Sequence, residues 1–341
     1  MAAVVFGPDR TLGRSRPRIG LVLGAGGVLG AAWMTGALAC LQDRLPCAAA
    51  DVGLVVGTSA GSVLAAALRC GASLDEMVAW QQGNATGIFS ESVSLAAHDG
   101  PLPPRPHLRP GSVPLACAAL VRPLDVPPWV GVSGWLPSGR GRHVALRSLV
   151  AALDRRCQSL VRSGPPSDWA DGRTWIAAMD YDTGKQVLFG RAGAPRASLP
   201  DAVVASCSIP GWYEPTVIGG RRYVDGGVRS MTSLSALSQT DVQEVYVLAP
   251  MASTEPDHPL QPHLRIERRL RQFLTRALIR QARALGTQGK RVTVVTPGAE
   301  DLAAMGVNLM DPRRRQAVLG ASFRTSAGAL ARLDVARPRA A

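Results

Sequence analysis

The chain has 341 residues, enough for one large domain or two modest ones. Apolar residues make up 46% of it and charged residues 18%, a globular composition that excludes a disordered tail protein and a disulfide-rich miniprotein. The net charge of +13 permits attraction to nucleic acid or to an anionic bilayer and does not choose between them.

The six cysteines form no C-x-x-C pair and no spacing with histidine that is typical of a zinc site. We therefore expect no metal, no cofactor and no disulfide framework. Reduced thiols favour a cytoplasmic location, and a peripheral position at the membrane is compatible with the same composition.

Residues 19–41 carry no charge and follow four arginines, so a hydropathy scan would offer them as a signal anchor or signal peptide. We favour a different interpretation. Residues 19–23 have the pattern of a buried parallel strand, glycines at 24, 26 and 27 interrupt it, and residues 30–45 continue at helical spacing. This unit predicts a strand, a tight turn and a helix.

A second unit of the same kind follows. Residues 51–56 have the pattern of a short apolar strand, and Gly57-Thr58-Ser59-Ala60-Gly61 opens a helix of small residues that runs to residue 68. Two such units so close together predict an α/β fold with a mostly parallel central sheet covered by helices on both faces. Residues 74–82 predict a further helix.

The region after residue 84 is different, because ten of the 26 prolines lie between Pro101 and Pro137. Regular structure is hard to place there, and we expect an insertion over the core. Trp129 and Trp135 in this region either touch a bilayer interface or pack back onto the core.

The later elements alternate again. We expect helices over 143–160, 199–207 and 263–285, strands over 174–179, 186–189, 245–248 and 292–295, and a hairpin over 217–224 that delivers Asp225 at its end. The expected organisation is a flexible segment over 1–17, a single domain over 18–320 and a tail over 321–341; within the domain lie a core over 18–232, the Pro-rich insert over about 84–140, and C-terminal strands and helices over 233–320.

The strongest chemical signal is Gly57-x-Ser59-x-Gly61 between a strand and a helix. A sharp turn there pushes the serine hydroxyl out of the sheet, and the glycines avoid backbone collisions. At a helix N-terminus the backbone dipoles also favour developing negative charge on Ser59. A glycine-rich chain contains such a string by chance, so the strand-turn-helix context carries the prediction.

The second signal is Gly24-Ala25-Gly26-Gly27-Val28-Leu29-Gly30. A dinucleotide-binding fingerprint would need glycine where Leu29 stands, so the spacing does not match. Two interpretations remain: a loop whose exposed amides bind an oxyanion, or close packing of a helix on a strand.

The third signal is Asp225-Gly226-Gly227, although an Asp-Gly pair alone often marks only a turn. A nucleophilic serine needs a base. A triad in the order Ser, Asp, His would have to use His258 or His263, the two histidines that follow Asp225.

These three motifs, in this order, resemble the patatin-like phospholipase family. Residues 178–185 and the segment from 205 to Asp225 also resemble the family, so the likeness covers residues 18–232 except the insert. It implies the three-layer patatin-like α/β fold. The sequence departs from the family at Leu29, where Arg or Lys is common, and at Ser230 and Thr232, where Asn and Pro are common.

The resemblance implies a serine hydrolase of the phospholipase A or lysophospholipase type, which cleaves lipid acyl esters through an acyl-enzyme and needs no histidine. The residues it assigns are the nucleophile Ser59, its partner Asp225, the oxyanion hole at Gly26, Gly27 and Val28, and the nucleophile elbow at Gly57 and Gly61. A carboxylate is a weak base at neutral pH, so we expect burial to raise the pKa of Asp225.

The expected partner is a lipid acyl ester, and no nucleic acid is expected. The helix over 263–285 combines leucines with arginines and could lie on an anionic membrane. We favour the simpler interpretation, in which its apolar stripe packs on the sheet and its arginines face water. A further hypothesis is a basic binding protein that keeps the fold and has lost activity.

Overall fold

The structure is a computed structural model and describes residues 2–8, 18–84, 87–90, 104–121, 125–160, 169, 171–255, 257 and 261–335. Its strands are β1 (Ala2–Phe6), β2 (Ile19–Leu23), β3 (Leu54–Thr58), β4 (Thr174–Asp180), β5 (Gln186–Phe189), β6 (Thr216–Ile218), β7 (Arg221–Asp225), β8 (Glu244–Leu248) and β9 (Arg291–Thr296). Its α-helices are α1 (Gly27–Gln42), α2 (Ala60–Arg69), α3 (Leu74–Gln82), α5 (Val113–Val121), α6 (Pro128–Trp135), α7 (Val144–Leu160), α8 (Leu199–Cys207), α9 (Pro262–Thr287), α10 (Ala299–Met305) and α11 (Arg315–Val335). Short 3₁₀ turns are η1 (Ala49–Asp51), η2 (Gly87–Phe89), η3 (Gly226–Val228), η4 (Leu234–Gln239) and η5 (Pro312–Arg314).

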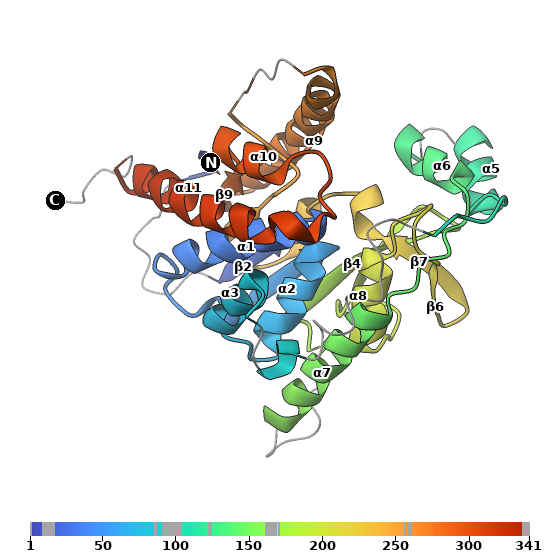
Figure 1. Cartoon of the computed structure of the whole chain (residues 1–341), viewed down its shortest axis with the longest axis horizontal. Helices are drawn as coiled ribbons and strands as arrows, with labels where there is room; N and C mark the ends of the chain where they lie inside the picture. Colours follow the sequence, from blue (N-terminus) through green and yellow to red (C-terminus); the bar gives the residue numbers. More distant parts are fainter. Residues whose placement is uncertain are drawn as a thin grey trace.

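Within the described residues, nine strands form one sheet in the order β1-β9-β8-β2-β3-β4-β7-β6, with β5 on β4. The five strands from β9 to β4 are parallel, and the strands at either end of the sheet are antiparallel to their neighbours. The predicted mostly parallel sheet is therefore confirmed (Figure 1).

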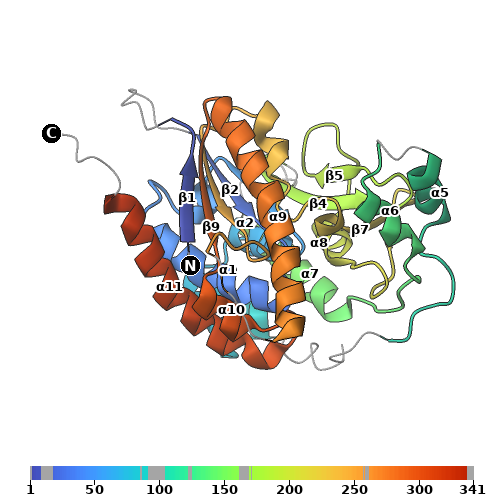
Figure 2. The ribbon, with the colours of Figure 1, turned by 90° about the horizontal axis from the view of Figure 1, so that it is seen from above.

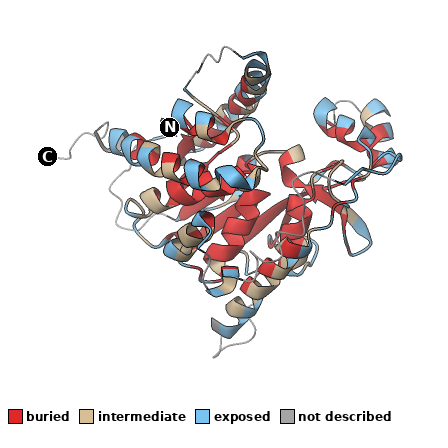
Figure 3. Ribbon diagram, in the orientation of Figure 1, coloured by how far each residue is buried: buried red, intermediate tan, exposed pale blue. Residues whose placement is uncertain are grey.

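The sheet separates two apolar layers, because successive side chains of a strand point to opposite faces. Leu21 and Leu23 face the layer under α1, α2, α8 and α11, whereas Val22 faces the layer under α9 and η4. Figure 2 shows α9 crossing one face while α1, α10 and α11 cover the other. Buried residues are concentrated in the strands and in the inward sides of these helices (Figure 3).

Residues 19–41 form β2, a turn and most of α1, and both elements are buried. The strand-turn-helix interpretation is confirmed, and no helix in the described ranges is long and apolar enough to cross a bilayer. Strands β2 and β5 and helices α3 and α8 have the bounds predicted from the sequence.

Two expectations about the chain ends were wrong. Residues 2–6 of the segment expected to be flexible form β1, because this apolar run finds the free edge of β9 and pairs antiparallel with it. The expected tail over 321–341 is helical as far as Val335, where α11 ends. Helix α11 lies close to α1 because Gly36 faces Ser322, whose hydroxyl donates to the Trp33 carbonyl at 2.7 Å. Residues 9–17 and 336–341 lie outside the described residues.

The Pro-rich insert contains the helix pair α5 and α6. Leu115, Val126 and Val130 pack against Tyr181 and Val224 at the end of the sheet that β4 and β7 form. The two tryptophans of α6 do not bury themselves in this contact, since Trp129 and Trp135 both remain more than half exposed. The insert is therefore a small helical lobe with an apolar outer surface.

Candidate active site

The register of β4 brings Ser59 and Asp225 together. Thr58, the last residue of β3, pairs with Ala177, and Asp225, the last residue of β7, pairs with the next residue, Ala178. Strand β5 pairs with both of these β4 residues and occupies the opposite edge. Strands β3 and β7 therefore meet end to end along one edge of β4, and the residue that follows Thr58 lies beside Asp225.

Ser59 occupies a strained turn between β3 and α2. Its backbone has φ 53° and ψ −121°, a region that non-glycine residues rarely enter and that is common at functional sites. Its N–H donates to the Ser206 hydroxyl at 2.9 Å, and its carbonyl accepts from the Ser62 hydroxyl at 2.6 Å. Ser206 in turn donates to the Ala177 carbonyl at 2.6 Å, so α8 and β4 together hold the turn.

The turn has no room for side chains at its two glycines. A Cβ on Gly57 would lie 2.6 Å from the Gly61 carbonyl oxygen, and a Cβ on Gly61 would lie 2.0 Å from the Leu23 carbonyl oxygen. Both contacts are with backbone, which cannot move aside as a flexible side chain does. The predicted elbow therefore depends on these glycines sterically.

We expect Gly61→Ala to lower the free energy of unfolding by about 3 kcal/mol or more, because the backbones of β2 and α2 must separate. The measurement is urea unfolding followed by circular dichroism. Gly328→Ala on α11 is the matched control, since nothing lies within 4 Å of its added Cβ and it should stabilise the helix slightly. Equal midpoints for the two variants would contradict the steric argument.

Asp225 is a buried carboxylate with few partners. Burial raises its pKa to about 6, and hydrogen bonds from the Ser59 side chain and the Gly227 N–H partly oppose that shift. The Gly227 bond to Oδ1 is 2.7 Å long, and the Asp225 N–H donates to the Ser208 carbonyl at 2.9 Å. The expected rise in pKa is present, and it suits a base that works near neutral pH.

The Gly-rich loop after β2 presents backbone donors beside this pair. The Gly24 and Ala25 amides donate to the carbonyls of Leu248 and Met231 at 2.9 and 2.7 Å. The following three amides, at residues 26–28, have no hydrogen-bond acceptor within the described ranges. They lie at the N-terminus of α1, where the helix dipole adds partial positive charge. Such a group of donors can stabilise an oxyanion.

Comparison with protein families gives one match. The family described as patatin-like phospholipase matches residues 21–237, more than half of the chain. The chain belongs to the patatin-like phospholipase family. A comparison with curated proteins finds no match.

Solved structures with a similar fold include VipD from Legionella pneumophila, at 11% identity and a TM-score of 0.44, covering 93% of this chain and 67% of that one. The complex of ExoU with SpcU from the type III secretion system of Pseudomonas aeruginosa gives 18% identity and a TM-score of 0.33, covering 94% of this chain and 60% of that one. This chain thus spans about two thirds or less of the length of those chains.

The patatin-like loop is anchored here without the basic residue that its first motif often carries. Leu29 is buried in the core, and its N–H donates to the Leu309 carbonyl at 3.0 Å. Pro250 packs on the other side, where a Cβ on Gly26 would lie 2.6 Å from its ring. The Pro250 carbonyl accepts from Arg271 at 2.6 Å, so α9 supports the loop from behind.

Sequence reasoning missed several of these supporting residues. Ser206 lies in the stretch that resembles the family, so that resemblance could have indicated its place beside the site. Leu309, Pro250 and Arg271 had no signal, because they reach the loop from parts of the chain that match no motif.

Neither histidine of the alternative triad has a described side chain. His258 lies outside the described residues, as does the side chain of His263 at the start of α9. His143 contacts the Cys207 carbonyl through Nε2 at 3.0 Å and stacks on Tyr213. Burial lowers the pKa of His143 to about 4, so it is neutral at pH 7.

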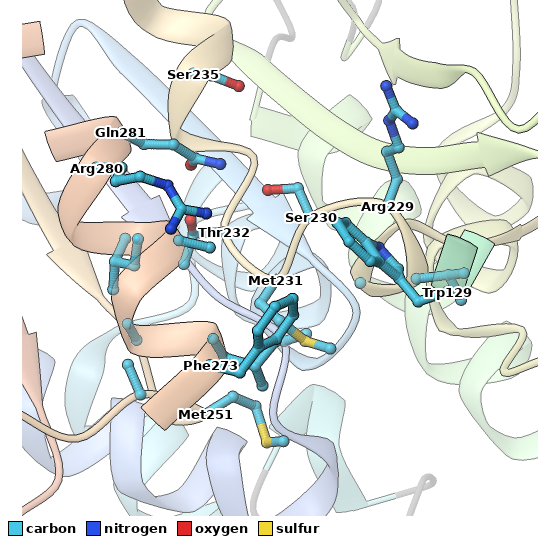
Figure 4. Close-up of a pocket in the computed structure, with 18 of the residues that line it drawn as sticks. Trp129, Arg229, Ser230, Met231, Thr232, Ser235, Met251, Phe273, Arg280 and Gln281 are labelled. Atoms are coloured by element: carbon cyan, nitrogen blue, oxygen red, sulfur yellow. The ribbon is translucent and has the colours of Figure 1, made fainter. Parts of the chain in front are cut away.

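A cavity of about 730 Å³ opens beside the patatin-like site, between η4, α6 and α9 (Figure 4). Ala25 and Gly227 form its wall nearest to Asp225, and apolar side chains such as Met251, Phe273 and Leu274 form much of the rest. Its volume and lining are those of a site for an apolar ligand. Among the described residues, no three His, Cys, Asp or Glu side chains gather as metal ligands would.

Proposed function

We propose that this chain is a serine hydrolase that cleaves lipid acyl esters through a Ser59–Asp225 dyad. The observation that carries the proposal is the strand register that places a serine in a strained turn beside a buried carboxylate. Burial raises the pKa of that carboxylate to about 6. The loop amides at residues 26–28, which have no acceptor among the described residues, supply the donors that acyl transfer requires. Membership of the patatin-like phospholipase family indicates that the substrate ester is a lipid.

The reaction proceeds in two halves. Asp225 accepts the Ser59 proton as Oγ attacks the acyl carbonyl carbon, and the amides of residues 26–28 hold the negative oxygen. Collapse of this intermediate breaks the ester bond and returns the proton to the leaving alcohol. Water then attacks the acyl-Ser59 ester, again giving a proton to Asp225, and the free acid leaves as Ser59 is reprotonated.

The cavity supports a long acyl chain as the preferred substrate. We expect Ala277→Trp, which fills part of the cavity, to lower turnover of a p-nitrophenyl palmitate ester about tenfold relative to the butyrate ester. Ala303→Trp, at an exposed position on α10, is the control and should leave that ratio unchanged. An equal fall for both chain lengths would place the acyl chain elsewhere.

A fluorophosphonate probe tests the dyad directly, because it labels only an activated serine. Labelling of the purified chain that Ser59→Ala abolishes supports the proposal. A triad esterase using His258 or His263 would instead lose labelling when both histidines are replaced. A binding protein without activity would not be labelled at all.

A further inference from the structure

We propose that the N-terminal half of α9 and the outer side of α6 form a docking surface for an anionic bilayer. The docking surface comprises Ile266, Leu270 and Phe273 on α9 and Trp129, Val132 and Trp135 on α6, all of which are exposed. The proposal deepens the proposed function and rests on it for the choice of a lipid partner. The apolar exposure itself is independent of that function.

In the N-terminal half of helix α9, apolar side chains face the solvent and arginine side chains are buried. Ile266 is 69% exposed, whereas Arg271, five residues later, is 1% exposed. Arg271 is paired with Glu267 and the Pro250 carbonyl, and the buried Arg268 is paired with Asp257 at 2.7 Å. Buried guanidinium groups tolerate this position because they are paired.

The C-terminal half of the same helix is conventional, with Leu278 and Leu285 packed on the sheet. The favoured sequence interpretation, an apolar stripe on the sheet and arginines in water, therefore holds only there. In the N-terminal half the charges that bind the core have turned the apolar stripe outward, where Phe273 meets Trp129 and the stripe otherwise remains exposed. A monomer in water gains nothing from that arrangement.

The two parts of the docking surface are continuous. The Trp129 ring meets the Phe273 ring edge-on, with 5.6 Å between their centroids, so α6 and α9 touch across the mouth of the cavity. Figure 1 shows α9 and the α5–α6 pair on the same upper side of the molecule. Figure 4 shows Trp129 and Phe273 among the residues that line the cavity.

This position favours a bilayer over a protein partner. Trp129, Val132 and Phe273 belong both to the docking surface and to the cavity wall, so a lipid can pass from a bilayer into the cavity without crossing water. A protein seated on the same residues would close the cavity.

The charges around the docking surface favour anionic lipid. Exposed arginines on α9 include Arg269, Arg276 and Arg280, and the one acidic residue of the helix, Glu267, is already paired with Arg268 and Arg271. Tryptophan beside arginine is typical of membrane interfaces, where indole rings lie at headgroup level and guanidinium groups bind phosphate.

The test measures binding of Ser59→Ala protein to vesicles by flotation, so that no substrate is consumed. The vesicles contain phosphatidylcholine, with or without phosphatidylglycerol. We expect binding to the anionic vesicles, weakened by salt. Adding Ile266→Ser and Trp135→Ser should lower the partition coefficient at least about tenfold, because two large apolar side chains no longer leave water.

Two controls accompany this variant. Val217→Ser on the β6–β7 hairpin also removes an apolar side chain that is 63% exposed, and it should bind vesicles as the parent does. Neither Ile266 nor Trp135 lines the cavity, so the double variant with Ser59 intact should hydrolyse soluble p-nitrophenyl butyrate at the normal rate. That rate also shows that the variant has folded.

Undiminished vesicle binding by the double variant would overturn the proposal. So would a dimer in size-exclusion chromatography that the double variant dissociates, since a second copy of the chain would then cover the surface. Failure of the proposed function is distinguishable, because it removes fluorophosphonate labelling and leaves vesicle binding by Ser59→Ala protein unaffected.

Discussion

Ser59→Ala is expected to lower hydrolysis of a lipid acyl ester by about 10⁴-fold or more and to abolish fluorophosphonate labelling. The loss is large because the substitution removes the atom that forms the covalent intermediate. Mass spectrometry of the intact protein measures the adduct, and titration of the acid released from the ester measures the rate.

The fold should survive this change. The variant would keep the backbone bonds of the turn to Ser206 and Ser62, which do not involve the Ser59 side chain. Ser326→Ala on α11 is the matched control, because that serine is equally buried and lies outside the site, so both labelling and rate should be normal. Labelling that persists in Ser59→Ala protein would remove Ser59 as the nucleophile.

Asp225→Asn is expected to lower kcat/KM by about 10³-fold, because the amide cannot accept the Ser59 proton. The wild-type rate should fall as pH drops below about 6, where Asp225 becomes protonated, and should be level above that pH. The residual activity of the variant should lack this step. A pH–rate profile of both proteins is the measurement, and near-normal turnover by the variant would exclude Asp225 as the base.

The same substitution is expected to stabilise the protein. Burial raises the folded-state pKa of Asp225 above its unfolded value of 3.8, so the folded state binds the extra proton and loses stability as pH rises from about 4 to 6. Above pH 6 the full cost of the buried charge, about 3 kcal/mol, is present. Asparagine carries no charge, and its Oδ1 can still accept from Gly227.

Urea unfolding at pH 7 should therefore show a higher midpoint for Asp225→Asn than for the wild type, and the difference should vanish near pH 4. Loss of rate together with a gain of stability is the behaviour of a functional group held in an unfavourable environment. A less stable variant at pH 7 would mean that the carboxylate is stabilised rather than penalised by its surroundings.

Local patterns determined most of the individual elements. The uniformly apolar run of β2 and the small-residue helix α8 were predictable because a fully buried strand or helix needs apolar residues at every inward position. Gly57 and Gly61 were recognisable because a tight turn leaves no space for Cβ. The three motifs and their order indicated the family, and the match of the patatin-like phospholipase family to residues 21–237 confirms it.

The meeting of Ser59 with Asp225 was decided by the register of β4. The family resemblance could pair these residues, but only strand pairing shows why they meet. The last residue of β3 lies opposite Ala177 of β4, and the last residue of β7 lies opposite Ala178 on the same edge. Register depends on contacts between distant segments and on the packing of both sheet faces, which no local pattern records.

The tertiary structure alone decided which side of α9 faces inward. Helical periodicity places Ile266 and Leu270 on a different side of the helix from Arg271, but it does not determine which of the two sides faces the protein interior. The loop at Pro250 offers a carbonyl that an arginine can reach, and Asp257 and Glu267 pair the remaining charge. Those partners come together only in the folded chain, and they turn the apolar residues toward the solvent.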